Sequence, residues 1–270
     1  INFLDTANMY GRGLSEERIG KALKDVRKNV IIATKFGMSM GEGPNTSGGS
    51  RRHIMEQVED SLRLLQTDYI DLYQIHRPDS ITPIEETIRA LDDLIHQGKV
   101  RYIGCSNFSA WQTCEAVWTS KSLNMAPFVS VQPEYNMLNR TVESELLPFC
   151  NQYNIGILPF YPLASGFLTG KYVHGQEAPE GTRLAGNERA RENTLTEKNF
   201  KILSGLAQFA DQQGHPMVEL AIAWLLARPA VSSVIAGATK EEQIIANVKA
   251  ADWKLTEEDM SEIDKILGIG

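Results

Sequence analysis

Four polar side chains of types that can carry acid–base chemistry lie at the ends of three strand-like segments. Asp5 closes the first segment and Tyr10 follows it closely, Lys35 closes the second, and His76 closes the third. In a parallel α/β barrel the carboxyl ends of all strands meet at one face, which is where active sites lie. The spacing therefore predicts that these side chains converge on one pocket, and it is the best indication in the sequence that the protein is an enzyme.

The residue types indicate which chemistry to expect. An ammonium group beside a phenol stabilises the phenolate, so a Lys35–Tyr10 pair would let the tyrosine donate a proton to a developing alkoxide. Asp5 would keep Lys35 charged and oriented, and His76 would donate a hydrogen bond to a carbonyl oxygen. The set contains no strong nucleophile and no metal triad. It suits reduction of a carbonyl group with hydride supplied by a cofactor.

A structural interpretation of the same residues stands beside the functional one. A single charged residue at a strand end is usually a structural partner, and Asp5 could serve only to pair with Lys35. Four polar residues at matching strand ends favour function for Tyr10, Lys35 and His76. The remaining histidines fall in helical or loop patterns and are expected on the surface. They are His53, His96, His174 and His215.

Composition limits the classes of protein that need consideration. The 270 residues are 42% hydrophobic and 23% charged, as in ordinary soluble proteins, and the formal charge of −7 disfavours general nucleic-acid binding. The three cysteines show neither metal-type nor disulfide-type spacing, so no metal site is predicted and a reduced, cytoplasmic setting is expected. No apolar run approaches the roughly 18 residues that a membrane span needs.

Short apolar runs alternate with amphipathic helical patterns along the whole chain. Strands are expected at 1–5, 30–34, 70–75, 102–105, 129–132, 156–160 and 234–236. Helices are expected near 15–24, 51–65, 84–97, 109–120, 143–153, 197–213, 217–227, 241–249 and 257–267. Helix-capping boxes are expected at Thr82–Glu85 and Thr239–Glu242, and Thr256 is expected to start the final helix. Loops 37–50 and 163–195 would lie on the active face.

Seven such βα units are countable, and eight would close a barrel. No G-x-G-x-x-G fingerprint of an open doubly wound sheet occurs. The expected fold is therefore an α/β (β/α)8 TIM-type barrel, forming a single domain over 1–270. Because the chain opens inside a strand at Ile1, we expect it to be truncated at the N-terminus, without the first strand.

Four segments of the sequence form a recognisable set of motifs in order along the chain: FLDTANMYGRGLSE (3–16), TK (34–35), DLYQIH (71–76) and GCSNF (104–108). Together they resemble the motifs of the aldo-keto reductases, and especially of the bacterial members and the potassium-channel β-subunit branch. The resemblance implies a (β/α)8 barrel in which Asp5, Tyr10, Lys35 and His76 form the catalytic tetrad. It also implies a hairpin and a first βα unit upstream of Ile1.

The resemblance implies NADPH as the cofactor. Ser106, Asn107 and Gln132 match the residues that hold the nicotinamide carboxamide, and either Phe160 or Tyr161 matches the ring that stacks on the nicotinamide. Further cofactor contacts are implied at Leu163 and, in the pyrophosphate segment, at Gly166, Leu168 and Lys171. The adenosine phosphate site is matched by Gly237, Thr239, Lys240, Gln243 and Asn247. On physical grounds Thr239 would cap a helix whose N–H groups attract an anion, and Lys240 would add charge.

The expected function is reduction of small-molecule aldehydes or ketones by an NADPH-dependent oxidoreductase. Two alternatives stay open: a cofactor-holding regulatory or scaffold subunit of another protein, and a barrel fragment without function. Met9, Phe36, Arg77 and Phe108 follow strand ends and are expected to line an open, tolerant pocket. Arg77 would either favour an anionic substrate or, as the preferred interpretation, pair with Asp79. The sequence carries no indication of oligomeric state.

Overall fold

The structure is a computed structural model that describes residues 1–268. The chain divides into two compact units. The first, called here the sheet unit, comprises residues 1–133 and 145–157, and the second, called the helical unit, comprises 134–144 and 158–270. The expectation of one domain over 1–270 stays a prediction.

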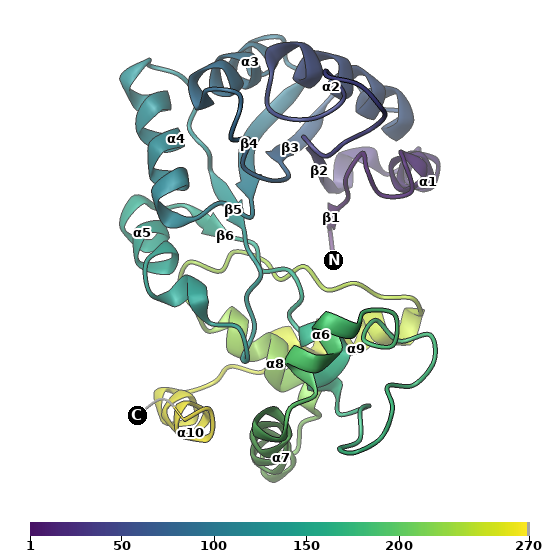
Figure 1. Cartoon of the computed structure of the whole chain (residues 1–270), viewed down its shortest axis with the longest axis vertical. Helices are drawn as coiled ribbons and strands as arrows, with labels where there is room; N and C mark the ends of the chain where they lie inside the picture. Colours follow the sequence, from purple (N-terminus) through teal and green to yellow (C-terminus); the bar gives the residue numbers. More distant parts are fainter. Residues whose placement is uncertain (269–270) are drawn as a thin grey trace. The chain divides into compact units, whose positions relative to one another are not determined.

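The sheet unit is built on six parallel strands in the order β1-β2-β3-β4-β5-β6, so neighbours in sequence are neighbours in the sheet. The strands are β1 (Phe3–Asp5), β2 (Ile31–Phe36), β3 (Ile70–Ile75), β4 (Val100–Ser106), β5 (Ser130–Gln132) and β6 (Gly156–Ile157). The helices of this unit are α1 (Leu14–Leu23), α2 (Arg51–Leu65), α3 (Ile84–His96), α4 (Ala110–Ser122) and α5 (Leu146–Tyr153), with the 3₁₀ turn η1 (Arg27–Asn29). The helices lie along the outer face of the curved sheet (Figure 1).

Register between neighbouring strands brings the carboxyl ends of the sheet together. Lys35 of β2 pairs with Gln74 of β3, and Ser106 of β4 pairs with Gln132 of β5. Strand β3 is buried along its whole length, as its apolar character predicted. Lys35 lies within β2, since this strand continues to Phe36 instead of ending at residue 34.

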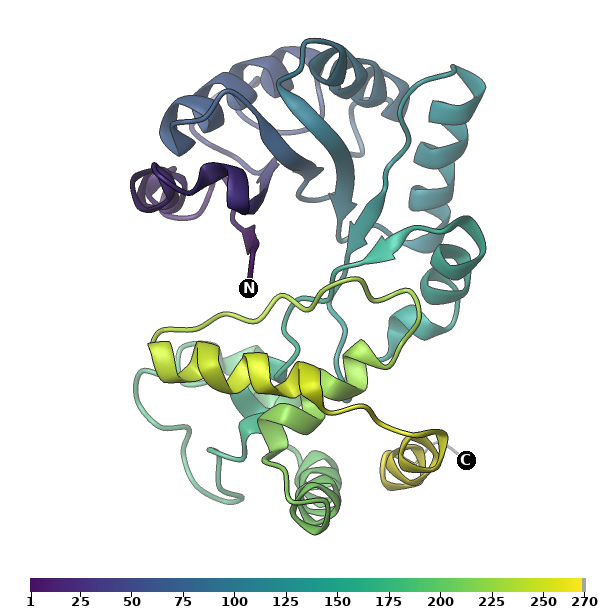
Figure 2. The same cartoon turned by 180° about the vertical axis from the view of Figure 1, so that it is seen from behind.

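The helical unit surrounds α8, whose residues are almost all buried. Its helices are α6 (Glu188–Thr194), α7 (Glu197–Gln212), α8 (Met217–Leu226), α9 (Glu241–Lys249) and α10 (Glu257–Ile266), with the 3₁₀ turns η2 (Thr141–Glu143), η3 (Ala164–Thr169) and η4 (Ala250–Asp252). Helices α8 and α9 pack against each other (Figure 2). Tyr135 packs edge-on against the buried Trp224 of α8, with ring centroids 5.3 Å apart.

The predicted seventh strand is absent as a strand from the described residues. Segment 234–236 contributes one isolated bridge, in which Ile235 pairs with Phe160 and its amide donates to the Pro159 carbonyl oxygen at 2.9 Å. The apolar run is bounded by Ser233 and Gly237, and its pairing with the neighbouring segment stops at this one bridge. Strand β6 likewise ends at Ile157 rather than at residue 160.

Two of the expected helix caps are also wrong. Helix α3 has Pro83 at its N-cap, without a side-chain cap, and the Thr82 hydroxyl bonds to the Asp79 carboxylate instead. Helix α9 has Lys240 at its N-cap, and Thr239 lies one residue too early to cap it. The expectation that Thr256 starts the final helix is confirmed, and Thr256 also forms a capping box with Asp259. None of the helices within residues 1–268 combines the length and the apolar character that a membrane span requires.

Helices α1 and α2 approach so closely at Gly20 that a side chain there has no room. A Cβ at this position would lie 2.5 Å from the Leu64 carbonyl oxygen and 2.6 Å from the Leu65 carbonyl carbon. We expect Gly20→Ala to destabilise the protein by about 2 kcal/mol, because overpacking typically costs 1–3 kcal/mol. Denaturant unfolding measures the change. The control is Gly186→Ala, where a Cβ would meet nothing within 4 Å; equal stability of the two variants would refute the close approach.

Candidate active site

The Lys35 ammonium is the centre of the candidate site. Its side chain is fully buried, and Nζ donates to Asp5 Oδ1 at 2.5 Å and to the Thr6 carbonyl oxygen at 2.9 Å. Burial lowers the pKa of Lys35, and the attraction and hydrogen bond of the Asp5 carboxylate oppose that shift. Asp5 and Lys35 come from the adjacent strands β1 and β2, so the sheet itself holds the pair together.

Tyr10 and His76 complete the group of four residues that the sequence predicted to converge. Lys35 Nζ lies 5.4 Å from the centroid of the Tyr10 ring. The Tyr10 and His76 rings meet edge-to-face with centroids 5.7 Å apart. Tyr10 is 41% exposed, so its ring is accessible from solvent while the lysine next to it is not. The structure brings the four side chains together, and their catalytic roles are taken up under the proposed function.

His76 is neutral at physiological pH. Burial, reinforced by the positive charges of Lys35 and Arg77, lowers the pKa of His76 to about 4. Its Nδ1 is buried and has no hydrogen-bond partner among residues 1–268. A neutral imidazole keeps one N–H donor, which is the form needed to hydrogen-bond a carbonyl oxygen.

The three residues expected to hold the nicotinamide carboxamide lie together and are bonded to this group. Gln132 Nε2 donates to Asp5 Oδ2 at 2.8 Å, and Ser106 Oγ donates to the Gln132 carbonyl oxygen at 2.8 Å. Asn107, with a left-handed φ of 61°, donates from Nδ2 to the His76 carbonyl oxygen at 3.0 Å. The carboxamide residues and the Asp5–Lys35 pair therefore form one continuous hydrogen-bonded network.

Sequence reasoning missed Gln74, which belongs to the same network. Its Nε2 donates to Asp5 Oδ2 at 3.4 Å from the fully buried strand β3. An amide side chain in a strand that is buried along its whole length was the available signal. Buried amides need partners, so such a residue is expected to face another polar group.

Most of the phosphate-site residues line one pocket of the helical unit, with a volume of about 370 Å³. The predicted residues in its lining are Tyr161, Leu163, Gly166, Lys171, Gly237, Thr239, Gln243 and Asn247. At Gly166, with φ 88°, a Cβ would lie 2.6 Å from Lys171 Nζ, so glycine leaves the space in which the ammonium lies. Thr239 donates from its amide to Gln243 Oε1 at 2.8 Å rather than capping α9.

Three predicted cofactor residues of the helical unit lie outside this lining. Leu168 is fully buried, Lys240 is exposed, and Phe160 is half-buried where it bridges to Ile235. Tyr161, in contrast, is 44% exposed and lines the pocket. Of the two neighbouring rings, Tyr161 is the one that lines the pocket.

Arg183 is a second residue that sequence reasoning missed. It lines the same pocket, and its guanidinium carbon lies 5.3 Å from the centroid of the Tyr161 ring. A Cβ on Gly237 would approach the Arg183 Nη2 atom to 3.3 Å. A basic residue in the long loop expected on the active face was the only sequence signal. With Lys171 it gives the pocket two cations, which fits a phosphate-bearing ligand.

Two of the residues expected to line a substrate pocket are core residues. Phe36 is fully buried against Tyr73, and Phe108 is 6% exposed and packs on Phe128. Both side chains pack into the core. Their position after a strand end in the sequence does not show in which direction the side chain points.

The expected pairing of Arg77 with Asp79 is also wrong. The Asp79 carboxylate instead accepts hydrogen bonds from the Gly49 amide at 2.7 Å and from the Ile81 amide at 2.9 Å. Arg77 is exposed and forms no ion pair within the described residues.

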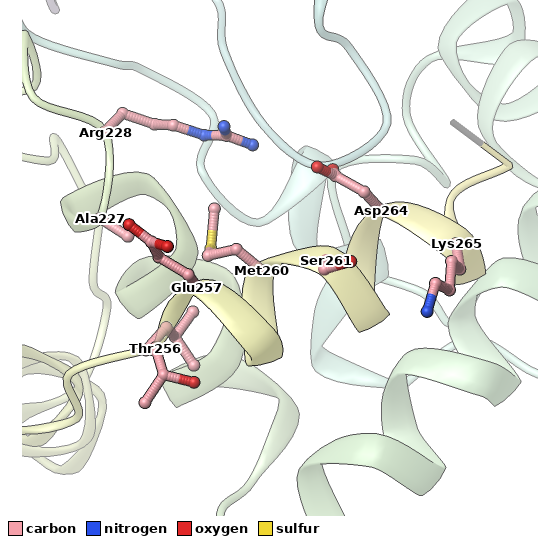
Figure 3. A pocket seen from close by; sticks show the side chains of 9 residues that line it. Ala227, Arg228, Thr256, Glu257, Met260, Ser261, Asp264 and Lys265 are labelled. Atoms are coloured by element: carbon pink, nitrogen blue, oxygen red, sulfur yellow. The ribbon is translucent and has the colours of Figure 1, made fainter. Parts of the chain in front are cut away.

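A larger hollow of about 570 Å³ lies beside α10 and contains none of the predicted residues (Figure 3). Two charged side chains of its lining already have partners. Asp264 accepts from Arg140 at 2.7 Å, and Arg228 lies 3.8 Å from Glu143 and over the Trp224 ring. Asp264 and Arg228 are therefore engaged in contacts within the helical unit.

Comparison with known proteins identifies the family. Residues 1–268 match the Aldo/keto reductase family. The chain belongs to that family.

The relatives of this chain are named for different functions. This chain is 41% identical over 275 residues to a probable voltage-gated potassium channel subunit beta of Oryza sativa subsp. japonica, and the match covers 99% of this chain and 83% of the relative. It is 37% identical over 282 residues to an L-glyceraldehyde 3-phosphate reductase of Escherichia coli O157:H7, covering 100% and 81%.

A solved structure supports the same family fold. The glycerol dehydrogenase AKR11B4 from Gluconobacter oxydans matches with a TM-score of 0.87 and 33% identity, covering 99% of this chain and 81% of that chain. Membership of the family supports a barrel-type α/β fold and an oxidoreductase activity.

The environment of His76 predicts its behaviour with pH. Its imidazole should titrate near pH 4, against about 6.5 in an unfolded chain. Between these values the unfolded state binds more protons, so stability should fall as the pH is lowered through that window. NMR titration and denaturation at each pH measure both effects, and His76→Gln should remove this part of the pH dependence. An imidazole that titrates at 6.5 or above would contradict the burial of His76.

Proposed function

We propose that this protein is an NADPH-dependent reductase of aldehydes or ketones in which Tyr10 is the proton donor. The observation that carries the proposal is the buried Lys35–Asp5 pair beside the ring of the accessible Tyr10, with a neutral His76 in edge-to-face contact with the same ring. A charge held in a buried position next to a phenol is an arrangement for stabilising phenolate.

Each residue then has one task in the reaction. NADPH, held at its nicotinamide end by Ser106, Asn107 and Gln132, would supply the hydride for the carbonyl carbon. The π electron pair moves to the carbonyl oxygen, which takes the Tyr10 hydroxyl proton as the new C–H bond forms. Lys35 stabilises the phenolate that Tyr10 becomes, and Asp5 keeps the Lys35 ammonium in place. The N–H of neutral His76 hydrogen-bonds the carbonyl oxygen and orients it.

We infer that the cofactor residues of the sheet unit and those of the helical unit bind different parts of the cofactor. In the sheet unit, Ser106, Asn107 and Gln132 would hold the carboxamide. Because Gln132 Nε2 is bonded to Asp5, its Oε1 is the atom that would accept from the carboxamide NH₂. In the helical unit, Lys171 and Arg183 would bind phosphate oxygens in the pocket that Gly166 keeps open.

Replacing the proposed proton donor gives the first test of the reaction. Tyr10→Phe should lower kcat by about 10²–10⁴-fold, the usual contribution of general acid catalysis, with the Kd for NADPH nearly unchanged. Steady-state kinetics and fluorescence titration measure the two quantities. The matched control is Tyr102→Phe on β4, where the ring is 58% exposed and outside the group of four. Unaltered turnover in Tyr10→Phe would overturn the assignment.

Lys240 is proposed to favour NADPH over NADH by contacting the 2′-phosphate from the N-cap of α9. Lys240→Ala should raise the Kd for NADPH by a factor of about 5, because an exposed charged contact contributes up to about 1 kcal/mol, and should leave the Kd for NADH as it is. Arg183→Ala should also weaken NADPH binding. The control is Lys249→Ala in the last turn of α9. An unchanged ratio of NADPH to NADH affinity in Lys240→Ala would exclude Lys240 as the residue that recognises the 2′-phosphate.

The substrate pocket is proposed to be broadly tolerant, with Arg77 adding a preference for anionic aldehydes. We expect 4-carboxybenzaldehyde to exceed benzaldehyde in kcat/KM by less than about tenfold, and Arg77→Gln to abolish the difference, since exposed charges act weakly. Kinetics across neutral, aromatic and anionic aldehydes provide the measurement. One substrate that exceeds all others by several orders of magnitude would contradict the tolerant pocket.

A second candidate function is a cofactor-holding subunit of another protein. It is favoured by the name of the Oryza sativa relative, a probable channel subunit beta. The two functions differ in turnover: a reductase consumes reduced nicotinamide in step with aldehyde, whereas a purely regulatory subunit binds NADPH without steady consumption.

A further inference from the structure

Asn8 ties the loop that carries Tyr10 to helix α2. Its backbone amide donates to the Lys35 carbonyl oxygen at 3.1 Å, and its side-chain Nδ2 donates to Gln57 Oε1 at 2.7 Å. Asn8 is 2% exposed and Gln57 is 9% exposed, so this amide–amide bond is shielded from water. Tyr10 follows two residues later in a turn closed by its own amide, which donates to the Ala7 carbonyl oxygen at 3.0 Å.

Helix α2 presents Gln57 from the face that packs inward. The residues of that face recur with helical spacing and include His53, one turn before Gln57. His53 is 1% exposed, so the expectation that it lies on the surface is wrong. Burial lowers the pKa of His53, whose ring also bonds to the backbone of Asn45 in loop 37–50. One face of α2 therefore holds the loops that follow both β1 and β2.

The Asn8–Gln57 bond fixes a direction as well as a distance. A buried amide that loses its partner costs about 1–3 kcal/mol, so the two side chains have a strong preference for this geometry. Asn8 Oδ1 has no partner among residues 1–268, which leaves Nδ2 as the atom that orients the side chain. Lys35 Nζ is bonded to the same loop at the Thr6 carbonyl oxygen. The loop is thus fixed to β2 on one side and to α2 on the other.

We propose that Gln57 is a positioning residue for Tyr10, acting through Asn8 to set where the phenol lies relative to Lys35. The proposal rests on the proposed reductase function. Gln57 itself touches none of the reacting groups. Displacing a catalytic group by 1 Å can cost up to about 10²-fold in rate, so loss of the tether should appear in kcat rather than in binding.

The test replaces Gln57 with side chains of similar length that keep or lose the acceptor. Gln57→Met should lower kcat by about tenfold or more, with KM for the aldehyde and for NADPH changed by less than about threefold. Gln57→Glu, which still accepts from Asn8 Nδ2, should recover kcat to within about threefold of the original protein. The double variant Asn8→Ala/Gln57→Met should have a kcat no lower than that of the slower single variant, because both substitutions remove the same Asn8–Gln57 hydrogen bond.

A stability-matched control separates positioning from general weakening. Asp92→Ala removes another hydrogen bond between a helix and a loop, donated by the Ala126 amide to Asp92 Oδ1 at 2.9 Å and partly buried, ahead of the amino-terminal end of β5. It should lower the melting temperature and leave kcat unchanged. A kcat loss in Gln57→Met that Asp92→Ala reproduces at equal loss of stability would overturn the proposal, as would full kcat in Gln57→Met.

A readout without turnover keeps the proposal distinct from the reductase function. NMR titration of ¹³C-tyrosine-labelled protein should show the Tyr10 phenol titrating at higher pH in Gln57→Met than in the original protein, with Gln57→Glu restoring the original value. Identical Tyr10 titration in all of them would overturn the positioning role. Absence of aldehyde reduction by the original protein, with a shifted Tyr10 titration in Gln57→Met, would instead refute the reductase function alone.

Discussion

The buried contact between the Lys35 ammonium and the Asp5 carboxylate is the interaction on which the rest of the site depends. An ammonium without solvent is costly unless it is paired and hydrogen-bonded, and Lys35 meets both conditions through Asp5 and the Thr6 carbonyl oxygen. Asp5 in turn accepts from Gln132 and Gln74. Adjacent parallel strands hold these donors and acceptors at their carboxyl ends, so the fold places a hydrogen-bonded partner beside the buried ammonium.

The same charge helps to set the protonation of its neighbour. Burial is the main reason that His76 stays neutral, and the Lys35 ammonium adds to the effect. A protonated His76 beside Lys35 would place two positive charges next to Tyr10. The neutral ring avoids that repulsion and keeps an N–H for a carbonyl oxygen. One paired lysine therefore favours both the proposed proton donor and the proposed hydrogen-bond donor.

The features that the sequence predicted are those that depend on local patterns. Helix α2 and strand β3 have the expected bounds because their apolar spacing is regular. The four polar strand-end residues converge because the carboxyl ends of parallel strands lie at the same end of the sheet. The features that it did not predict depend on contacts between distant segments. Gln57 is an ordinary helical glutamine until Asn8 meets it, and Arg183 is an ordinary loop arginine until Gly237 lies beside it. Phe36 follows a catalytic candidate in sequence and still points into the core.

The most direct test of the central claim compares Asp5→Asn with the double variant Asp5→Asn/Lys35→Met in denaturant unfolding and in aldehyde reduction. Breaking a buried ion pair on one side costs about 3–5 kcal/mol, whereas replacing the whole pair by neutral groups is often nearly neutral. Asp5→Asn should therefore be strongly destabilised, and the double variant should regain most of that stability while neither reduces aldehydes at an appreciable rate. A double variant as unstable as Asp5→Asn would contradict the account. So would aldehyde reduction at the rate of the unsubstituted protein in either Asp5→Asn or the double variant.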